Sequence, residues 1–161
     1  MTRAVFEYDK DNRPRAEIII QNGKHKLHLF PVIDSGADIT MIPKDVGEDL
    51  RLEPPRKKEI EEIIGVGGVV KCVRRNIKIE IGDYHFFLNS GWLFEDEGFA
   101  LLGRDVFERF DILFKQSPHK KIILDSDKKA FGFWRYKTNQ KPTKTFINII
   151  ELLKITDSDE I

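Results

Sequence analysis

The sequence predicts a mainly β protein whose body is one domain. Asn22-Gly23 lies between two apolar runs, which is a strong signal for a β-hairpin. Residues 77–81 alternate apolar and charged side chains, as expected for a strand with one buried face. No internal repeat is visible in the 161 residues, a length that can bury a proper core in one domain.

Strand-like segments recur along the body of the chain. They are residues 17–20, 26–33, 60–64, 69–73, 77–81, 84–88, 112–114 and 121–124. Gly65-Val66-Gly67-Gly68 separates two of them and predicts a long hairpin with a glycine tip. We expect most of these strands to be antiparallel, because hairpin turns join them.

Three other segments of the body have different predicted structures. The charged residues 1–12 are expected to form a loose arm, and the charged segment 44–58, with Pro54-Pro55, a loop. A short helix should begin near Asp105, which can cap it, because Glu108 occupies the reciprocal position of a capping box. The body is therefore expected to have one or two short helices beside its strands.

The C-terminal segment differs in character from the body. Residues 137–144 are basic and polar, which indicates a linker, and four apolar residues then follow at the spacing of one stripe on an amphipathic helix. These four are Phe146, Ile149, Ile150 and Leu153. We therefore divide the chain into a body at residues 1–136 and a basic linker with a helical tail at residues 137–161. The helix could pack on the body, occupy a cleft as an inhibitor or dock a partner.

Composition argues against several classes of protein. Lys and Arg together number 27, as do Asp and Glu, so no basic field favours nucleic acid. No segment approaches the roughly 20 apolar residues that a membrane helix requires. The first residues lack the apolar run of a signal peptide, and the single cysteine, Cys72, cannot form an intrachain disulfide. We therefore expect a cytoplasmic protein with no membrane or nucleic-acid partner, in which Cys72 is a buried, small apolar residue.

Asp34-Ser35-Gly36 is the motif that points most directly to chemistry. Taken alone, the triplet can be a turn, because Asp and Ser side chains bond nearby amides and Gly accepts positive φ. Its context supports a catalytic interpretation as well. The apolar run before it brings Asp34 to the edge of the core, and Gly36 lets the backbone turn back closely.

Three motifs, in this order, resemble those of the retropepsins, the retroviral-type aspartic proteases. Asp34-Ser35-Gly36-Ala37-Asp38 resembles the catalytic motif, and Gly65-Val66-Gly67-Gly68 resembles the tip of the flap. Leu101-Leu102-Gly103-Arg104-Asp105 resembles the motif that opens the family's C-terminal helix. The resemblance covers residues 16–126. It implies a retropepsin-like half-barrel with a flap hairpin and a short helix, to which this chain adds its amphipathic tail helix.

The resemblance implies an aspartic endopeptidase that hydrolyses extended, apolar peptide segments. Two carboxylates that share one proton can activate water and protonate a carbonyl, because close like charges cannot both ionise. The chain has one Asp-Ser-Gly triplet, so the second carboxylate must come from Asp34 of a second copy across a two-fold axis. We therefore expect a homodimer that acts on a peptide or protein substrate without metal or cofactor. The alternative is a non-catalytic or latent module that keeps the fold for dimerisation or peptide binding.

The resemblance also implies roles for single residues. The catalytic residues are Asp34, Ser35 and Gly36, where Ser35 braces the loop of the second copy and Gly36 offers its carbonyl to the substrate. The substrate-binding residues are Ala37, Asp38, Ile64, Gly65, Val66, Gly67, Phe99 and Leu101. The large apolar members of this set could instead belong to the core. The residues that support the site are Gly103, Arg104 and Asp105. Arg104 should pair with Asp38, unless it is only a solvated surface residue.

Overall fold

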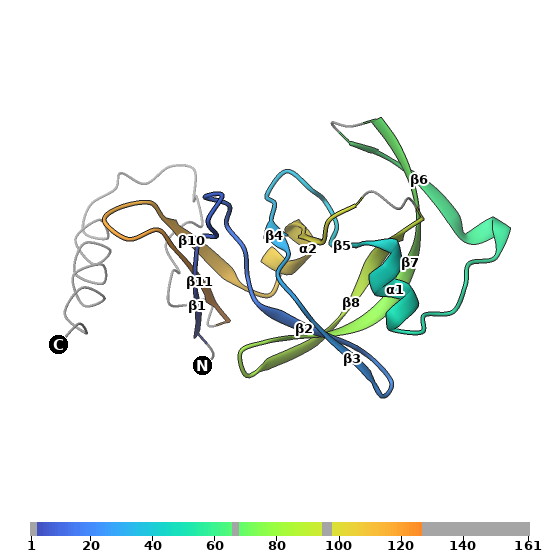
Figure 1. The fold of residues 1–161 in the computed structure, drawn as a ribbon, viewed down its shortest axis with the longest axis horizontal. Coiled ribbons are helices and arrows are strands. Elements are labelled where there is room, and N and C mark those ends of the chain that lie inside the picture. The colour runs from blue at the N-terminus through green and yellow to red at the C-terminus, as the bar shows by residue number, and fades with distance from the viewer. Residues whose placement is uncertain (1–2, 66–67, 95–97, 127–161) are drawn as a thin grey trace, which may run out of the picture. The chain divides into compact units, whose positions relative to one another are not determined.

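The computed structural model describes residues 3–65, 68–94 and 98–126, and β-strands dominate these ranges (Figure 1). The strands form a sheet of three and a sheet of eight. This arrangement confirms the mainly β class that the sequence predicts. The predicted boundary after residue 136 and the predicted tail helix lie outside the described residues.

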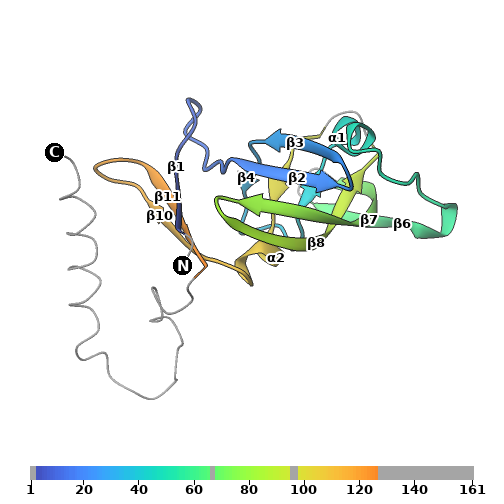
Figure 2. The same ribbon diagram turned by 90° about the horizontal axis from the view of Figure 1, so that it is seen from below.

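The larger sheet carries the loop that contains Asp34. Its strands follow the order β3-β2-β7-β8-β5-β9-β4, and β6 pairs with β7 beside that path. Figure 2 shows the neighbouring strands β3, β2, β7 and β8. The strands are β2 (Ile18–Asn22), β3 (His25–Leu29), β4 (Val32–Ile33), β5 (Met41–Ile42), β6 (Ile60–Gly65), β7 (Gly68–Ile81), β8 (Tyr84–Leu93) and β9 (Leu101–Leu102). Because β9 lies between β5 and β4, it contacts the strands on both sides of the Asp34 loop.

The hairpins predicted for this sheet are confirmed. β2 pairs with β3, and Gly23 turns between them with a φ of +56°. β7 pairs with β8 from Cys72 to Ile81. β6 pairs with β7 as far as Gly65 opposite Gly68, so the predicted long hairpin is present (Figure 1). Its tip, residues 66–67, lies outside the described residues.

One expected strand is divided into two. Residues 26–33 contain β3 and β4, with Phe30 and Pro31 between them. Pro31 has no backbone N–H to donate to a ladder, which favours a break at this position. The chain leaves β3 here, and β4 pairs parallel with β9 instead.

The smaller sheet shows that one expectation about the N-terminus is wrong. It has the order β1-β11-β10 and consists of β1 (Arg3–Glu7), β10 (Asp111–Lys115) and β11 (Lys121–Asp125). The segment expected to be a loose arm thus contains a paired strand. Ala4 and Phe6 pack on the core, and Arg3 Nε donates to the buried carboxylate of Asp125 at 3.1 Å. β1 is stabilised by β11 and Asp125, which are distant in the sequence, so the charged local sequence of β1 does not predict a strand.

Helical turns are short, and two of them lie where no helix was predicted. α1 (Lys44–Asp49) and the 3₁₀ turn η1 (Lys57–Glu59) lie in the segment expected to be a loop. α1 forms because Val46, together with Leu50 just after it, is buried in the core. α2 (Arg104–Phe107) begins where the sequence predicts a helix. Its N-cap residue is Gly103 and no side chain caps it, so the capping role expected for Asp105 is wrong.

The core joins the two sheets within the described part of the chain. Ile122 and Leu124 of the smaller sheet belong to the same buried cluster as Ile20 and Ile79 of the larger one. Met41, Cys72 and Leu93 form a second, smaller cluster. Cys72 is fully buried, as predicted. None of the helices in the described ranges is long and apolar enough to cross a membrane.

Candidate active site

Residues 34–40, here called the Asp34 loop, connect β4 to β5 and lie against residues 102–105, here called the Gly103 segment. The Asp34 N–H donates to the Leu102 carbonyl at 2.9 Å. The Arg104 N–H donates to the Ala37 carbonyl at 2.8 Å. Two motifs that are far apart in the sequence therefore form one structural unit held by main-chain hydrogen bonds.

The Asp34 carboxylate is half-buried and is held by its own loop. The Gly36 N–H donates to Asp34 Oδ1 at 2.8 Å. A Cβ at residue 36 would lie 3.1 Å from the same oxygen, so glycine lets the loop close on the carboxylate without crowding. Ser35 and Gly36 are exposed. The bonds predicted for them involve a second chain and a substrate, and they remain predictions.

The Asp34 loop presents one carboxylate of the pair that metal-free peptide hydrolysis would use. One carboxylate can accept a proton from water, but a second group must donate a proton to the carbonyl. Within the described ranges, no three His, Cys, Asp or Glu side chains lie together as ligands for a metal ion. Asp34 is the residue of this loop that could supply the first of these two groups.

Arg104 pairs with Asp38, as the sequence predicts. Arg104 Nη2 donates to Asp38 Oδ1, and the two side chains keep 60% and 76% of their exposure. Exposed ion pairs typically stabilise a fold by about 0.2–1 kcal/mol, because water screens the charges and two long side chains lose freedom. This pair therefore holds the loop only weakly.

Asp105 makes a set of bonds that the sequence did not indicate. Its carboxylate accepts from the Thr40 N–H at 2.9 Å and from the Thr40 hydroxyl at 2.8 Å. The Thr40 Oγ1 in turn accepts from the Gly103 N–H at 3.1 Å. Hydrogen bonds to a charged group typically contribute about 1.5–3 kcal/mol, so this set outweighs the exposed ion pair. Only the three-dimensional approach of α2 to β5 identifies Thr40.

Gly103 allows the two segments to approach closely. A Cβ at residue 103 would lie 2.4 Å from the carbonyl carbon of Ile39 and 2.8 Å from its Cα. These are backbone atoms, which cannot move aside as a flexible side chain could. The glycine is therefore required at this contact, whereas its predicted role in supporting catalysis remains a prediction.

The residues predicted to bind substrate have different surroundings. Ile64 on the β6–β7 hairpin is 83% exposed and Phe99 is 60% exposed, so neither belongs to the core. Leu101 is half-buried and packs against the Met41–Cys72–Leu93 cluster. Gly65 is exposed at the last described position of β6, whereas Val66 and Gly67 lie outside the described residues.

The Cys72 side chain is fully buried. Burial raises the pKa of its thiol, because a thiolate would lose its hydration there. It packs beside Met41, which follows the Asp34 loop directly. Its environment therefore favours the neutral, unreactive thiol.

Comparison with solved structures identifies the fold. A retropepsin-like aspartic protease from Rickettsia conorii matches with a TM-score of 0.61 and 17% identity, over 77% of this chain and 99% of that one. EIAV protease, solved in complex with the inhibitor HBY-793, matches with a TM-score of 0.51 and 24% identity, over 64% of this chain and 92% of that one. The described chain thus has the retropepsin-like fold.

The sequence itself identifies the family. The profile described as "Retroviral aspartyl protease" matches residues 10–114, which is well over half of the chain. The chain belongs to the retroviral aspartyl protease family. No curated protein sequence matches it significantly.

Proposed function

We propose that the protein is an aspartic endopeptidase whose active site forms from the Asp34 loops of two identical chains. The main-chain anchoring of this loop on the Gly103 segment, in a chain of the retroviral aspartyl protease family, carries the proposal. One Asp34 would accept a proton from the attacking water while the other donates a proton to the scissile carbonyl. Two carboxylates in contact share one proton because their charges repel.

The need for two chains follows from the number of triplets. The 161 residues contain one Asp-Ser-Gly sequence. A two-fold axis between two copies would bring equivalent carboxylates together, since an isologous interface pairs each residue with its own copy. In this dimer Ser35 would brace the partner's loop, and the Gly36 carbonyl would accept from the substrate backbone.

We propose that the substrate is an extended peptide with apolar side chains around the cut bond. The β6–β7 hairpin would cover it as a flap, and main-chain pairing would supply affinity. The exposure of Ile64 and Phe99 supports an apolar preference, because large apolar side chains left in water favour contact with apolar groups. Ala37, Asp38, Gly65 and Leu101 complete the proposed binding residues among those described.

The test is cleavage of a peptide library by purified protein and by its Asp34→Asn variant. The amide keeps the size of the carboxylate but cannot act as acid and base, so cleavage should be lost while the dimer persists. Asp83→Asn is the matched control, because Asp83 lies exposed in the turn between β7 and β8. Cleavage by Asp34→Asn at the wild-type rate would overturn the proposal.

A dimer that binds peptides and cleaves none would favour the alternative of a latent or non-catalytic module. The same library separates the two functions if bound and cleaved peptides are both recovered. Sequencing the cleaved products would also give the side-chain preference at the cut bond. Products with charged residues on both sides of that bond would contradict the proposed apolar specificity.

A further inference from the structure

We propose that the contact between Thr40 and Asp105 positions the Asp34 loop, so that Thr40 is a positioning residue for the Asp34 carboxylate. The test of this proposal by peptide cleavage rests on the proposed protease function, whereas the test by amide hydrogen exchange does not. The inference comes from hydrogen bonds that link the end of the loop to the first turn of α2.

The Thr40 hydroxyl acts as both donor and acceptor in one chain of hydrogen bonds. It accepts from the Gly103 N–H and donates to Asp105 Oδ1, while the Thr40 N–H donates to Asp105 Oδ2. A hydroxyl has one donor and can act as acceptor at the same time, so the side chain satisfies both neighbours. Removing the hydroxyl would leave a buried N–H and a carboxylate oxygen without this partner.

These bonds fix the far end of the Asp34 loop. The near end is fixed by the bond from the Asp34 N–H to Leu102, and the middle by the bond from the Arg104 N–H to Ala37. All three contacts reach the same Gly103 segment. The loop therefore keeps its shape as long as both of its ends remain hydrogen-bonded to residues 102–105.

The Thr40–Asp105 contact is better protected from water than the ion pair between Arg104 and Asp38. Thr40 is 2% exposed, whereas the side chains of Arg104 and Asp38 are mostly exposed. Hydrogen bonds out of water are stronger and compete less with solvent. The ion pair between Arg104 and Asp38 is therefore secondary, and the loop depends chiefly on Thr40 and Asp105.

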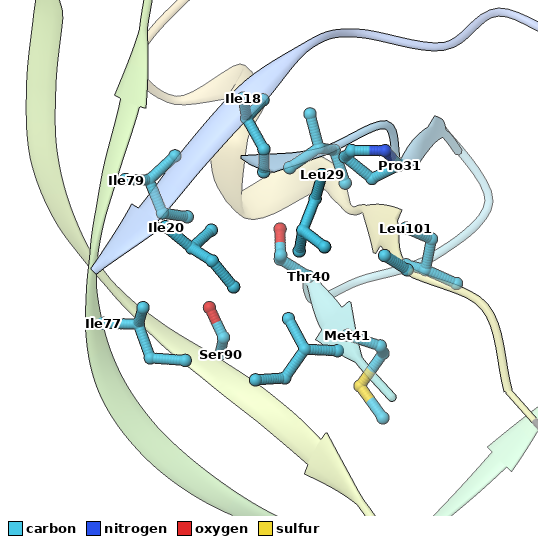
Figure 3. A pocket seen from close by; sticks show the side chains of 13 residues that line it. Ile18, Ile20, Leu29, Pro31, Thr40, Met41, Ile77, Ile79, Ser90 and Leu101 are labelled. Atoms are coloured by element: carbon cyan, nitrogen blue, oxygen red, sulfur yellow. The ribbon is translucent and has the colours of Figure 1, made fainter. Parts of the chain in front are cut away.

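Ser90 provides a matched control for the Thr40 hydroxyl. Both side chains line one cavity of about 10 Å³ among apolar residues, and both are nearly fully buried (Figure 3). The Ser90 hydroxyl has no hydrogen-bond partner in the described part of the chain. Removing this hydroxyl changes buried polarity beside the loop without breaking a bond to it.

The first test compares peptide cleavage by Thr40→Val, Thr40→Ser and Ser90→Ala at protein concentrations where the dimer is complete. Thr40→Val should lower kcat by about tenfold or more with little change in KM, because displacement of a reacting group by about 1 Å costs up to 100-fold. Thr40→Ser keeps the hydroxyl and should restore most of kcat. Ser90→Ala should cleave like the wild type.

The second test measures amide hydrogen exchange of the same variants and does not require activity. Thr40→Val should speed exchange of the Arg104 and Asp34 N–H groups by about tenfold or more, since both depend on the register of the loop. Thr40→Ser should not. Ile81→Val, at a fully buried residue that ends β7, controls for a general loss of stability and should leave these two amides protected relative to the rest of the chain.

The outcomes separate this proposal from the proposed function. Amide exchange at Arg104 and Asp34 that is faster in Thr40→Val and returns to the wild-type rate in Thr40→Ser supports the positioning role, even if no peptide is cleaved. Wild-type cleavage, with Thr40→Val unchanged in both kcat and exchange, overturns the positioning role and leaves the protease function intact. Equal losses in Thr40→Val and Ile81→Val would also overturn it, because they would indicate stability alone.

Discussion

The backbone N–H of Asp34 donates to the backbone carbonyl of Leu102 at 2.9 Å, which links the Asp-Ser-Gly triplet to the Gly-Arg-Asp motif. The second main-chain bond, from Arg104 to the Ala37 carbonyl, continues the contact along the loop. A change in residues 102–105 should therefore affect the Asp34 loop directly. The predictions below use this dependence.

Gly103→Ala should destabilise the protein by about 1–3 kcal/mol, the usual cost of overpacking a close contact. The added Cβ would lie 2.4 Å from the carbonyl carbon of Ile39, so the backbone of one segment must shift. Urea unfolding measures the change. Gly65→Ala is the control, because a Cβ there meets no atom within 4 Å. If both variants unfold at the same urea concentration as the wild type, the close approach does not limit the fold.

Arg104→Ala should lower the free energy of unfolding by only about 0.2–1 kcal/mol, as expected for an exposed ion pair. High salt should reduce the difference from the wild type, because salt screens exposed charges. Urea unfolding at low and high salt measures both effects. A loss well above 1 kcal/mol that is insensitive to salt would indicate that Arg104, rather than Thr40 and Asp105, holds the loop.

Asp9 and Glu80 should stabilise the fold at mildly acidic pH and lose this contribution only in stronger acid. Hydrogen bonds from the Arg13 N–H and from other donors hold the pKa of Asp9 below its ordinary value of 3.8. The Lys26 ammonium likewise holds the pKa of Glu80 below 4.5. Groups with lowered pKa stabilise the fold above their unfolded pKa and lose this contribution as pH falls through the folded pKa. A carboxylate pair that shares a proton is also expected to work at mildly acidic pH, where the fold should be intact.

Asp9→Asn tests the sign of this effect. The variant should be less stable than the wild type at neutral pH. The difference should shrink as pH falls from about 4 through the lowered pKa of Asp9, where the folded wild-type carboxylate also becomes neutral. Thermal unfolding across the pH range measures it. A difference that grows as pH falls would contradict the direction given for the Asp9 pKa.

Local sequence signals predicted much of the fold and part of the site. Asn22-Gly23, the glycine tip after Ile64 and the alternation at residues 77–81 each determine structure over a few residues, so the hairpins could be predicted. Arg104 and Asp38 could be paired because both stand at motif positions of the family that the chain resembles.

The elements that were not predicted depend on partners distant in the sequence. β1 has a charged sequence and becomes a strand because β11 pairs with it and the core receives Ala4 and Phe6. Thr40 has no local signal, because its role comes from the approach of Asp105. Asp105 itself fits a capping box in sequence, yet its carboxylate binds Thr40 rather than the amides of its own helix.

The most direct test of the two-chain active site is a titration of wild-type chains with Asp34→Asn chains that are refolded together. If one site uses Asp34 from both chains, mixed dimers are inactive. An equal mixture should then keep about a quarter of the activity of the same total amount of wild type, because random pairing gives that share of intact dimers. Mixing with Asp83→Asn chains should leave activity unchanged. A decline to about half in the Asp34→Asn mixture, in proportion to the wild-type fraction, would mean that each chain works alone and would contradict the account.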